Sequence, residues 1–192
     1  NQSTFLAAVK QRITANNDGF PNQNPSNKSY EINGYQINGQ DVFLDETQAQ
    51  YLNGNGLILA INCDNGWVCW GNRTACYPDN TDVKDFDIAV RDCGNYLINS
   101  CIIACSPNVD QIIDRAFILR VETKLQAWLD GLVGSGKLIS GSISFPRDEN
   151  PLDELLNGNI VFLLDYCTGT TASSITSKIA FNAKDLTKIS GE

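Results

Sequence analysis

The chain has 192 residues, 42% of them hydrophobic, and a formal net charge of −8 at pH 7. This length can bury one sizeable core or two small ones, and the composition excludes wholesale disorder. The acidic balance, without any cluster of lysine or arginine, excludes nucleic acid as the main partner, and no apolar run is long enough to span a bilayer.

Histidine and methionine are both absent from the sequence. The lack of histidine removes the commonest general base and the commonest metal ligand. Without an initiating methionine, the chain is expected to be a piece of a longer protein.

Seven cysteines stand at positions 63, 69, 76, 93, 101, 105 and 167. Their number is odd, and no pair has the C-x-x-C spacing of a zinc site. The pattern favours buried free thiols, which pack as small hydrophobic residues, over disulfides or a metal site. We therefore expect no metal, no cofactor and no catalytic residue in this chain.

The first elements are a helix and a polar loop. Ser3 is able to cap a helix that ends before Gly19, and residues 20–38 are rich in asparagine, proline and glycine. Asp45, with Gln48 three residues later, predicts a capped short helix.

Two apolar runs, residues 57–62 and 66–74, follow across a short polar connection. Such a pair predicts a β-hairpin. The second run is apolar on both faces, so we expect its strand to be interior and covered on both sides. Trp67 and Trp70 are the predicted core anchors, one on each face.

Two helices are expected after the hairpin. Asp92 is expected to begin the first, whose apolar residues include Leu97, Ile98, Ile102 and Ile103. The second follows the start signal Ser106-Pro107, a hydroxyl cap before a proline.

The second helix is the best-defined element of the sequence. Its apolar residues recur at steps of three and four, which predicts one continuous amphipathic helix over residues 107–132. Ile113, Phe117 and Trp128 are its predicted core anchors.

Strands dominate the last third of the chain. We expect strands at residues 138–145 and 159–166, with a short helix between them, and a last strand at residues 174–183 that alternates apolar and small polar side chains. This last strand follows a flexible turn and is suited to pairing with the sheet edge of another chain. The candidate residues of this inter-subunit strand are Ser174, Ile175, Ser177, Ile179 and Phe181.

One motif imitates a nucleotide site. Residues 131–138 match a phosphate-binding loop until Leu138, where the motif requires serine or threonine. The order here is helix to strand, whereas the motif runs from strand to helix. We interpret this glycine-rich stretch as a helix stop.

These elements predict an α+β fold, with a mixed sheet, flanking helices, one long amphipathic helix and a C-terminal arm strand. We expect a core domain over residues 1–172, and a C-terminal strand and arm over residues 173–192.

The order of motifs resembles the contractile tail sheath proteins of bacteriophages and phage-tail-like particles. The motifs that carry this resemblance are the W-G-x-R-T-like strand end within 66–74, the segment 86–91, the helix start Ser106-Pro107-Asn108, and the segments 150–151, 158–164 and 173–181. Asp92 departs from the family pattern, since a second arginine is expected there.

The resemblance implies a structural subunit that stacks in hexameric rings around a tail tube and drives contraction. It implies arms that add strands to the sheets of neighbouring subunits. The implied partners are other sheath subunits, the tail tube protein, the baseplate and the tail terminator, with no nucleic acid and no membrane. The implied location is a virion tail or phage-tail-like particle that assembles in the bacterial cytoplasm.

Two other functions stay open. The chain could be a tail tube or baseplate structural protein, although tube proteins are expected to be mainly strand. It could also be a cysteine-dependent hydrolase, although a reactive thiolate needs a neighbouring base or cation and the chain has no histidine.

Overall fold

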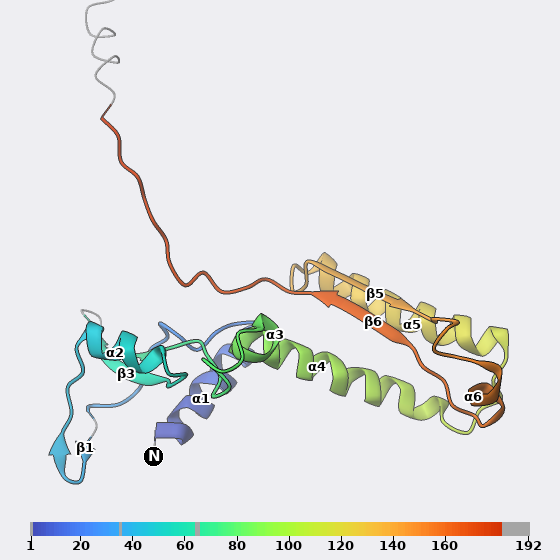
Figure 1. Ribbon diagram of the computed structural model, residues 1–192, viewed down its shortest axis with the longest axis horizontal. Helices are drawn as coiled ribbons and strands as arrows, with labels where there is room; N and C mark the ends of the chain where they lie inside the picture. The colour runs from blue at the N-terminus through green and yellow to red at the C-terminus, as the bar shows by residue number, and fades with distance from the viewer. Residues whose placement is uncertain (1, 35, 64–65, 182–192) are drawn as a thin grey trace, which may run out of the picture.

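The computed structural model describes residues 2–34, 36–63 and 66–181, and the molecule is elongated (Figure 1). The helices are α1 (Gln2–Ala15), α2 (Glu46–Asn53), α3 (Val83–Phe86), α4 (Ile88–Cys105), the 3-10 turn η1 (Ser106–Asn108), α5 (Arg115–Gly134) and α6 (Leu152–Leu156). The strands are β1 (Gln36–Ile37), β2 (Gln40–Asp41), β3 (Leu59–Cys63), β4 (Gly66–Trp70), β5 (Ser140–Ser144) and β6 (Leu163–Cys167).

The described strands form three separate antiparallel pairs, β1–β2, β3–β4 and β5–β6. The α+β class is confirmed, but the expectation of one mixed sheet is wrong. The pairs β1–β2 and β3–β4 are joined by short turns, whereas residues 145–162, which include α6, connect β5 to β6 in a long β-hairpin. The helices α3, α4 and α5 intervene between β4 and β5, and they hold the last two hairpins far apart (Figure 1).

The β3–β4 hairpin is covered on both faces, as its apolar sequence predicts. Ala60 and Cys69 pair across the strands and pack with Val9 of α1. Ile61 and Val68 pair one position further along and belong to a cluster on the other face, together with Ala49 of α2. Adjacent residues of a strand point to opposite faces, so each helix takes one face of the hairpin.

The long helix is shorter than the sequence predicts. Ser106 and Pro107 begin only the single turn η1, and α5 starts at Arg115. Asp110 has a φ of 65°, a left-handed conformation that a helix cannot contain. Asp114 is the N-cap of α5, and its carboxylate accepts a hydrogen bond of 2.6 Å from the backbone N–H of Phe117. The prediction of one continuous helix over 107–132 is therefore wrong.

The helix before it starts earlier than expected. Asp87 caps α4 by accepting hydrogen bonds from the backbone N–H groups of Ala89 and Val90, at 2.9 and 3.2 Å. Asp92, the expected first residue, lies inside α4 and forms a salt bridge with Lys10 of α1 at 2.7 Å. A buried aspartate is the better cap because its carboxylate meets two otherwise unpaired N–H groups.

Phe20, in the loop after α1, packs the N-terminal part of the chain against α4 and α5. Phe20 is 1% exposed and packs with Cys93 and Leu97 of α4 and with Leu129 of α5. The Tyr96 ring meets the Phe20 ring edge-on, with 5.0 Å between the centroids. This cluster fixes α4, α5 and the loop after α1 as one body.

The cap geometry leads to a stability prediction. Asp114→Ala should lower the free energy of unfolding by about 1 kcal/mol, because it removes the acceptor of the Phe117 N–H. Ser106→Ala is the matched control and should change it by less than about 0.5 kcal/mol, since Ser106 caps no long helix. Denaturant melts of both variants measure the difference, and an equal loss in both would contradict the start of α5 at Arg115.

Candidate assembly surfaces: the β5–β6 hairpin and the C-terminal arm

Neither a metal-binding cluster nor a membrane-spanning helix is present among the described residues. No three or more cysteine, aspartate or glutamate side chains among them are grouped to hold a metal ion. In that same part of the chain, no helix has the length and apolar character needed to cross a bilayer. The surfaces that stand out are instead a two-stranded sheet and the extended segment that follows it.

The β5–β6 hairpin lies across α4 and α5. Its residues alternate between partly buried and exposed along both strands, so one face packs on the helices and the other faces solvent. Gly141 of β5 lies against Leu129 of α5, where a Cβ atom would come within 3.2 Å of the leucine side chain. On β6, the hydroxyl of Tyr166 lies over Gly94 of α4, where a Cβ atom would approach it to 2.5 Å. The two glycines let the hairpin sit directly on the helices.

The chain leaves this hairpin along a fixed path. Thr168, directly after β6, is 9% exposed. Thr171 and Ser173 then accept hydrogen bonds from the amides of Asn24 and Asn72, at 3.2 and 3.4 Å. Residues 168–173 are thereby attached to the N-terminal part of the molecule, away from β6 (Figure 1).

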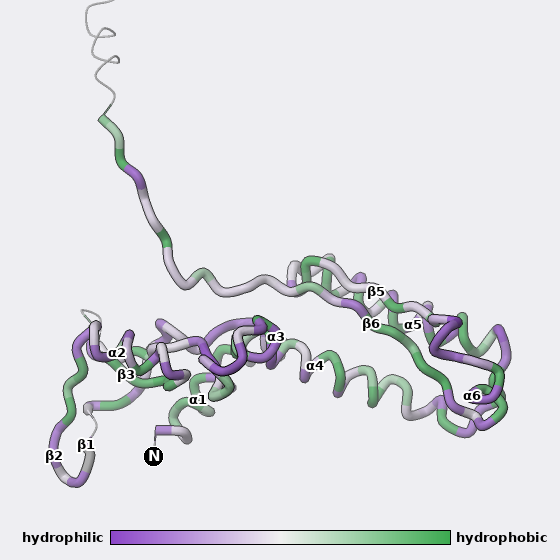
Figure 2. The backbone as a smooth tube through the Cα atoms, viewed as in Figure 1, coloured by the Kyte–Doolittle hydropathy of each residue, from purple (hydrophilic) through white to green (hydrophobic). Residues whose placement is uncertain are grey.

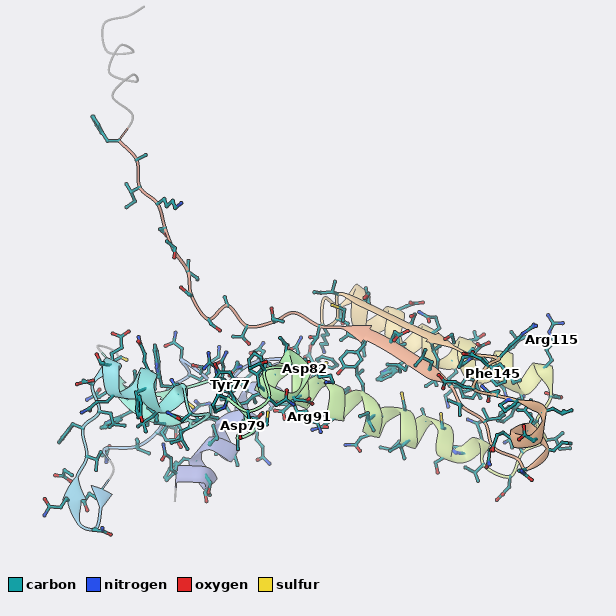
Figure 3. The ribbon with its side chains drawn as sticks, in the orientation of Figure 1. Tyr77, Asp79, Asp82, Arg91, Arg115 and Phe145 are labelled. Atoms are coloured by element: carbon teal, nitrogen blue, oxygen red, sulfur yellow. The ribbon has the colours of Figure 1, made fainter. Side chains whose placement is uncertain are left out.

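Beyond this path, the described residues 174–181 of the C-terminal arm (residues 173–192) are extended (Figure 1). These residues contact no other described element, and their side chains project into solvent (Figure 3). Ile175, Ile179 and Phe181 are 86%, 97% and 84% exposed. Hydrophobic positions recur among polar ones along this segment (Figure 2). These three apolar side chains are therefore accessible to another molecule.

The expected last strand is therefore not a strand within the subunit. Residues 174–181 have no regular secondary structure, and residues 182 and 183 of the predicted strand lie outside the described residues. The candidate residues Ser174, Ile175, Ser177, Ile179 and Phe181 are all exposed. Their pairing with another subunit stays a prediction.

The predicted core anchors differ in how deeply they are buried. Phe117 is 7% exposed and forms a core cluster with Val121 and Leu125. Trp67, Trp70 and Trp128 are partly buried and pack against the clusters from their margins, while Ile113 is partly buried and precedes α5. The buried residues of β4 are instead Val68 and Cys69, the two smaller side chains that lie between these tryptophans in the sequence.

Two features of these surfaces were not identified from the sequence. Ile98 and Ile102 were counted among the apolar residues of their helix, but they are 60% and 62% exposed. Gln126, an ordinary polar residue of an amphipathic helix, contacts the backbone of β5. Helical periodicity carries no signal for either feature, because both depend on where β5 and β6 lie.

The thiols give no sign of a nucleophile. Burial raises the pKa of Cys69 to about 11 and that of Cys93 to about 11, where the hydroxyl of Thr168 offsets part of the rise. Cys63 and Cys167 are exposed, but no histidine exists to activate them. A thiol kept protonated by burial is a packing residue.

Comparisons with known proteins find the same resemblance to tail sheath proteins that the sequence motifs carry. No protein-family model matches the chain. The tail sheath protein of Burkholderia phage BcepMu is 25% identical over 153 residues, which are 78% of this chain and 32% of the relative. The major tail sheath protein of Serratia phage KSP20 is 29% identical over 131 residues, 66% of this chain and 32% of the relative. The aligned region spans about a third of the length of these curated relatives.

Solved structures show the same fold. The sheath complex of an extracellular contractile injection system, PVC, in its contracted state, matches 94% of this chain and 51% of its own chain, with a TM-score of 0.77 and 15% identity. The helical sheath of the anti-feeding prophage in its contracted state matches 90% of this chain and 48% of its own, with a TM-score of 0.74 and 21% identity. The resemblance to contractile tail sheath proteins is confirmed.

The thiol environments lead to a labelling prediction. At pH 8, an alkylating reagent should modify Cys63 and Cys167 rapidly in the native protein and leave Cys69 and Cys93 unmodified until the protein unfolds. Peptide mass spectrometry measures the four rates. Rapid native labelling of Cys93 would contradict its burial.

The same raised pKa values make the stability of the folded protein depend on pH. The raised pKa values favour the neutral thiols in the folded state, so their stabilisation is fully present below pH about 9 and is lost as the pH rises toward about 11. Cys93→Ala should therefore lose less stability than the native protein between pH 9 and 11. Identical pH profiles would show that Cys93 does not titrate differently in the two states.

Proposed function

We propose that this chain is a structural subunit of a contractile tail sheath, which polymerises as stacked rings around a tail tube and drives contraction. The observation that carries the proposal is the C-terminal arm, whose apolar residues are exposed on a subunit that is otherwise folded. The similarity to curated tail sheath proteins supports it. In this proposal residues 1–172 form the core domain and residues 173–192 form the C-terminal strand and arm.

The arm fits the role of a link between subunits. An extended segment that alternates apolar and polar residues is able to complete the sheet of another subunit, gaining backbone hydrogen bonds and burying one face. Such pairing is directional and is retained while the bodies of the subunits rotate. Repetition around a ring raises the effective concentration of every link, so weak links make a stable lattice.

The partners follow from this role. We propose other copies of the same chain in rings and stacks, the tail tube protein, the baseplate and the tail terminator. The location is the tail of a phage or phage-tail-like particle that assembles in the cytoplasm of its bacterial host. The role needs no cofactor, nucleic acid or membrane, and no catalytic residue.

Two alternatives are less well supported. A tail tube protein is expected to be mainly strand, whereas α4 and α5 are long helices and each described sheet has only two strands. A cysteine-dependent hydrolase requires an activated thiolate, and the buried thiols are held protonated.

Deleting residues 174–192 from the full-length protein tests the role of the arm. We expect a soluble subunit with an unchanged melting temperature that no longer forms cylinders, because residues 174–181 contact no other described element of their own subunit. Ile179→Pro should act in the same way, since proline removes a backbone donor and disfavours a paired strand. Ile179→Val is the matched control and should polymerise normally. Negative-stain electron microscopy and a thermal melt measure both properties.

Two results would contradict this role. Normal cylinders from the truncated protein would show that the arm links nothing. Unfolding on truncation would show that the arm belongs to the core of its own subunit.

A further inference from the structure

One side-chain amide takes the place of a neighbouring strand at β5. Gln126 of α5 lies beside the outer edge of β5, which faces away from β6. Its Oε1 accepts a hydrogen bond of 3.0 Å from the backbone N–H of Ile143, and its Nε2 donates one of 3.2 Å to the carbonyl of Gly141. One residue of a parallel neighbouring strand would bond to the same two groups. Gln126 therefore acts as a strand surrogate.

The orientation of this amide is fixed by a third hydrogen bond. Its Nε2 also donates to Oδ1 of Asp130, one turn further along α5, at 2.8 Å. Both N–H groups and the oxygen of the amide are then used. A flipped amide would place its NH₂ group against the N–H of Ile143 and lose all three bonds. Asp130 is thus a positioning residue for Gln126.

The outer edge of β5 is short. Alternate residues of an antiparallel strand direct their backbone groups away from the partner strand, and in β5 these residues are Gly141 and Ile143. The ladder cannot continue through Pro146, which has no N–H. There the buried amide of Asn150 bonds instead to the N–H and the carbonyl of Val161, at 2.8 and 2.9 Å. Gln126 consequently bonds to both of the outward-facing residues of β5.

The sequence of β5 gives this edge no protection of its own. Residues 140–144, Ser-Gly-Ser-Ile-Ser, contain no charge and no proline, the residues that usually prevent pairing at an exposed edge. A small, uncharged strand is also able to pair in more than one register. Protection must come from outside the strand, and in the described part of the chain Gln126 is the side chain that hydrogen-bonds to its backbone.

A closed β5 limits what the hairpin is able to form. Gly141 and Ile143 pair in register with Tyr166 and Leu164. The backbone groups of these two β6 residues point outward on the opposite side, where no described residue is hydrogen-bonded to them. A two-stranded sheet with two free edges adds a further copy at each edge, which gives an open-ended fibre. With one edge closed, pairing between hairpins stops at two copies.

We propose that Gln126, oriented by Asp130, blocks the edge of β5 and keeps copies of this chain from stacking their β5–β6 hairpins into open-ended fibres. The block acts within each subunit. It goes beyond the proposed function and does not depend on it.

Hydrogen exchange of the full-length protein tests the block. Gln126→Met keeps the length of the side chain but removes both hydrogen bonds to β5, so the Ile143 amide should exchange about fivefold faster or more. Thr123→Met is the matched control, an exposed change on the same helix that should leave this rate unchanged. An unchanged rate in Gln126→Met would overturn the block.

Asp130→Ala tests the orientation of the amide. It removes the acceptor of the third hydrogen bond from an exposed position, so the fold should be intact and the Ile143 amide should exchange about twofold faster. Where thermal melts show that Gln126→Met unfolds below the native protein, Asp130→Ala carries the test of the block. An unchanged Ile143 rate in that variant then overturns the proposal.

Electron microscopy tests the consequence of opening β5. Concentrated Gln126→Met, kept below its melting temperature, should form fibres that differ from cylinders. In these fibres the amides of α5 should stay protected, and the Ile143 amide should become protected again because β5 has gained a strand. The native protein and Thr123→Met should form no such fibres. Their absence in Gln126→Met, an unprotected Ile143 amide within them, or equal fibres from Thr123→Met would each overturn the proposal.

Discussion

Backbone hydrogen bonding at the edges of the β5–β6 hairpin is the constraint on which the other features depend. A two-stranded sheet leaves a row of N–H and C=O groups on each outer side, and such rows attract other strands. Gln126 occupies the row on β5, while the row at Leu164 and Tyr166 stays open. The same subunit carries, in residues 174–181, an extended segment without a partner. One molecule thus holds an unpaired strand edge and an extended segment that do not meet.

Packing and polar contacts join the parts of the molecule that lie between the β6 edge and residues 174–181. Phe20 ties the loop after α1 to α4 and α5, and Lys10 and Asp92 pair between α1 and α4. Asn24 and Asn72 hold the path that leads from β6 to the arm. A pull on the arm is therefore taken up by the N-terminal part of the molecule as well as by β6. The proposed lattice needs this property, because its links must hold while the subunits turn.

The sequence predicts local features better than it predicts which surfaces meet. The capping box at Asp45 and the β3–β4 hairpin depend on nearby residues, and both are confirmed. The start of α5 was placed at Ser106 because a cap signal is present there, but Asp110 adopts a left-handed conformation and Asp114 supplies the cap that the helix uses. The exposure of Ile98 and the contacts of Gln126 arise only from the position of the hairpin over the helices. No periodicity within either helix reports that position.

The central claim is that the arm of one subunit completes the sheet of another at β6. An electron cryomicroscopy reconstruction of the assembled full-length protein, at a resolution that traces the backbone, tests it most directly. The account predicts an additional strand, formed by residues 174–181 of a different copy, hydrogen-bonded to Leu164 and Tyr166 and covering Ile98. An arm that pairs with its own hairpin, or a β6 edge that stays open in the lattice, would contradict it.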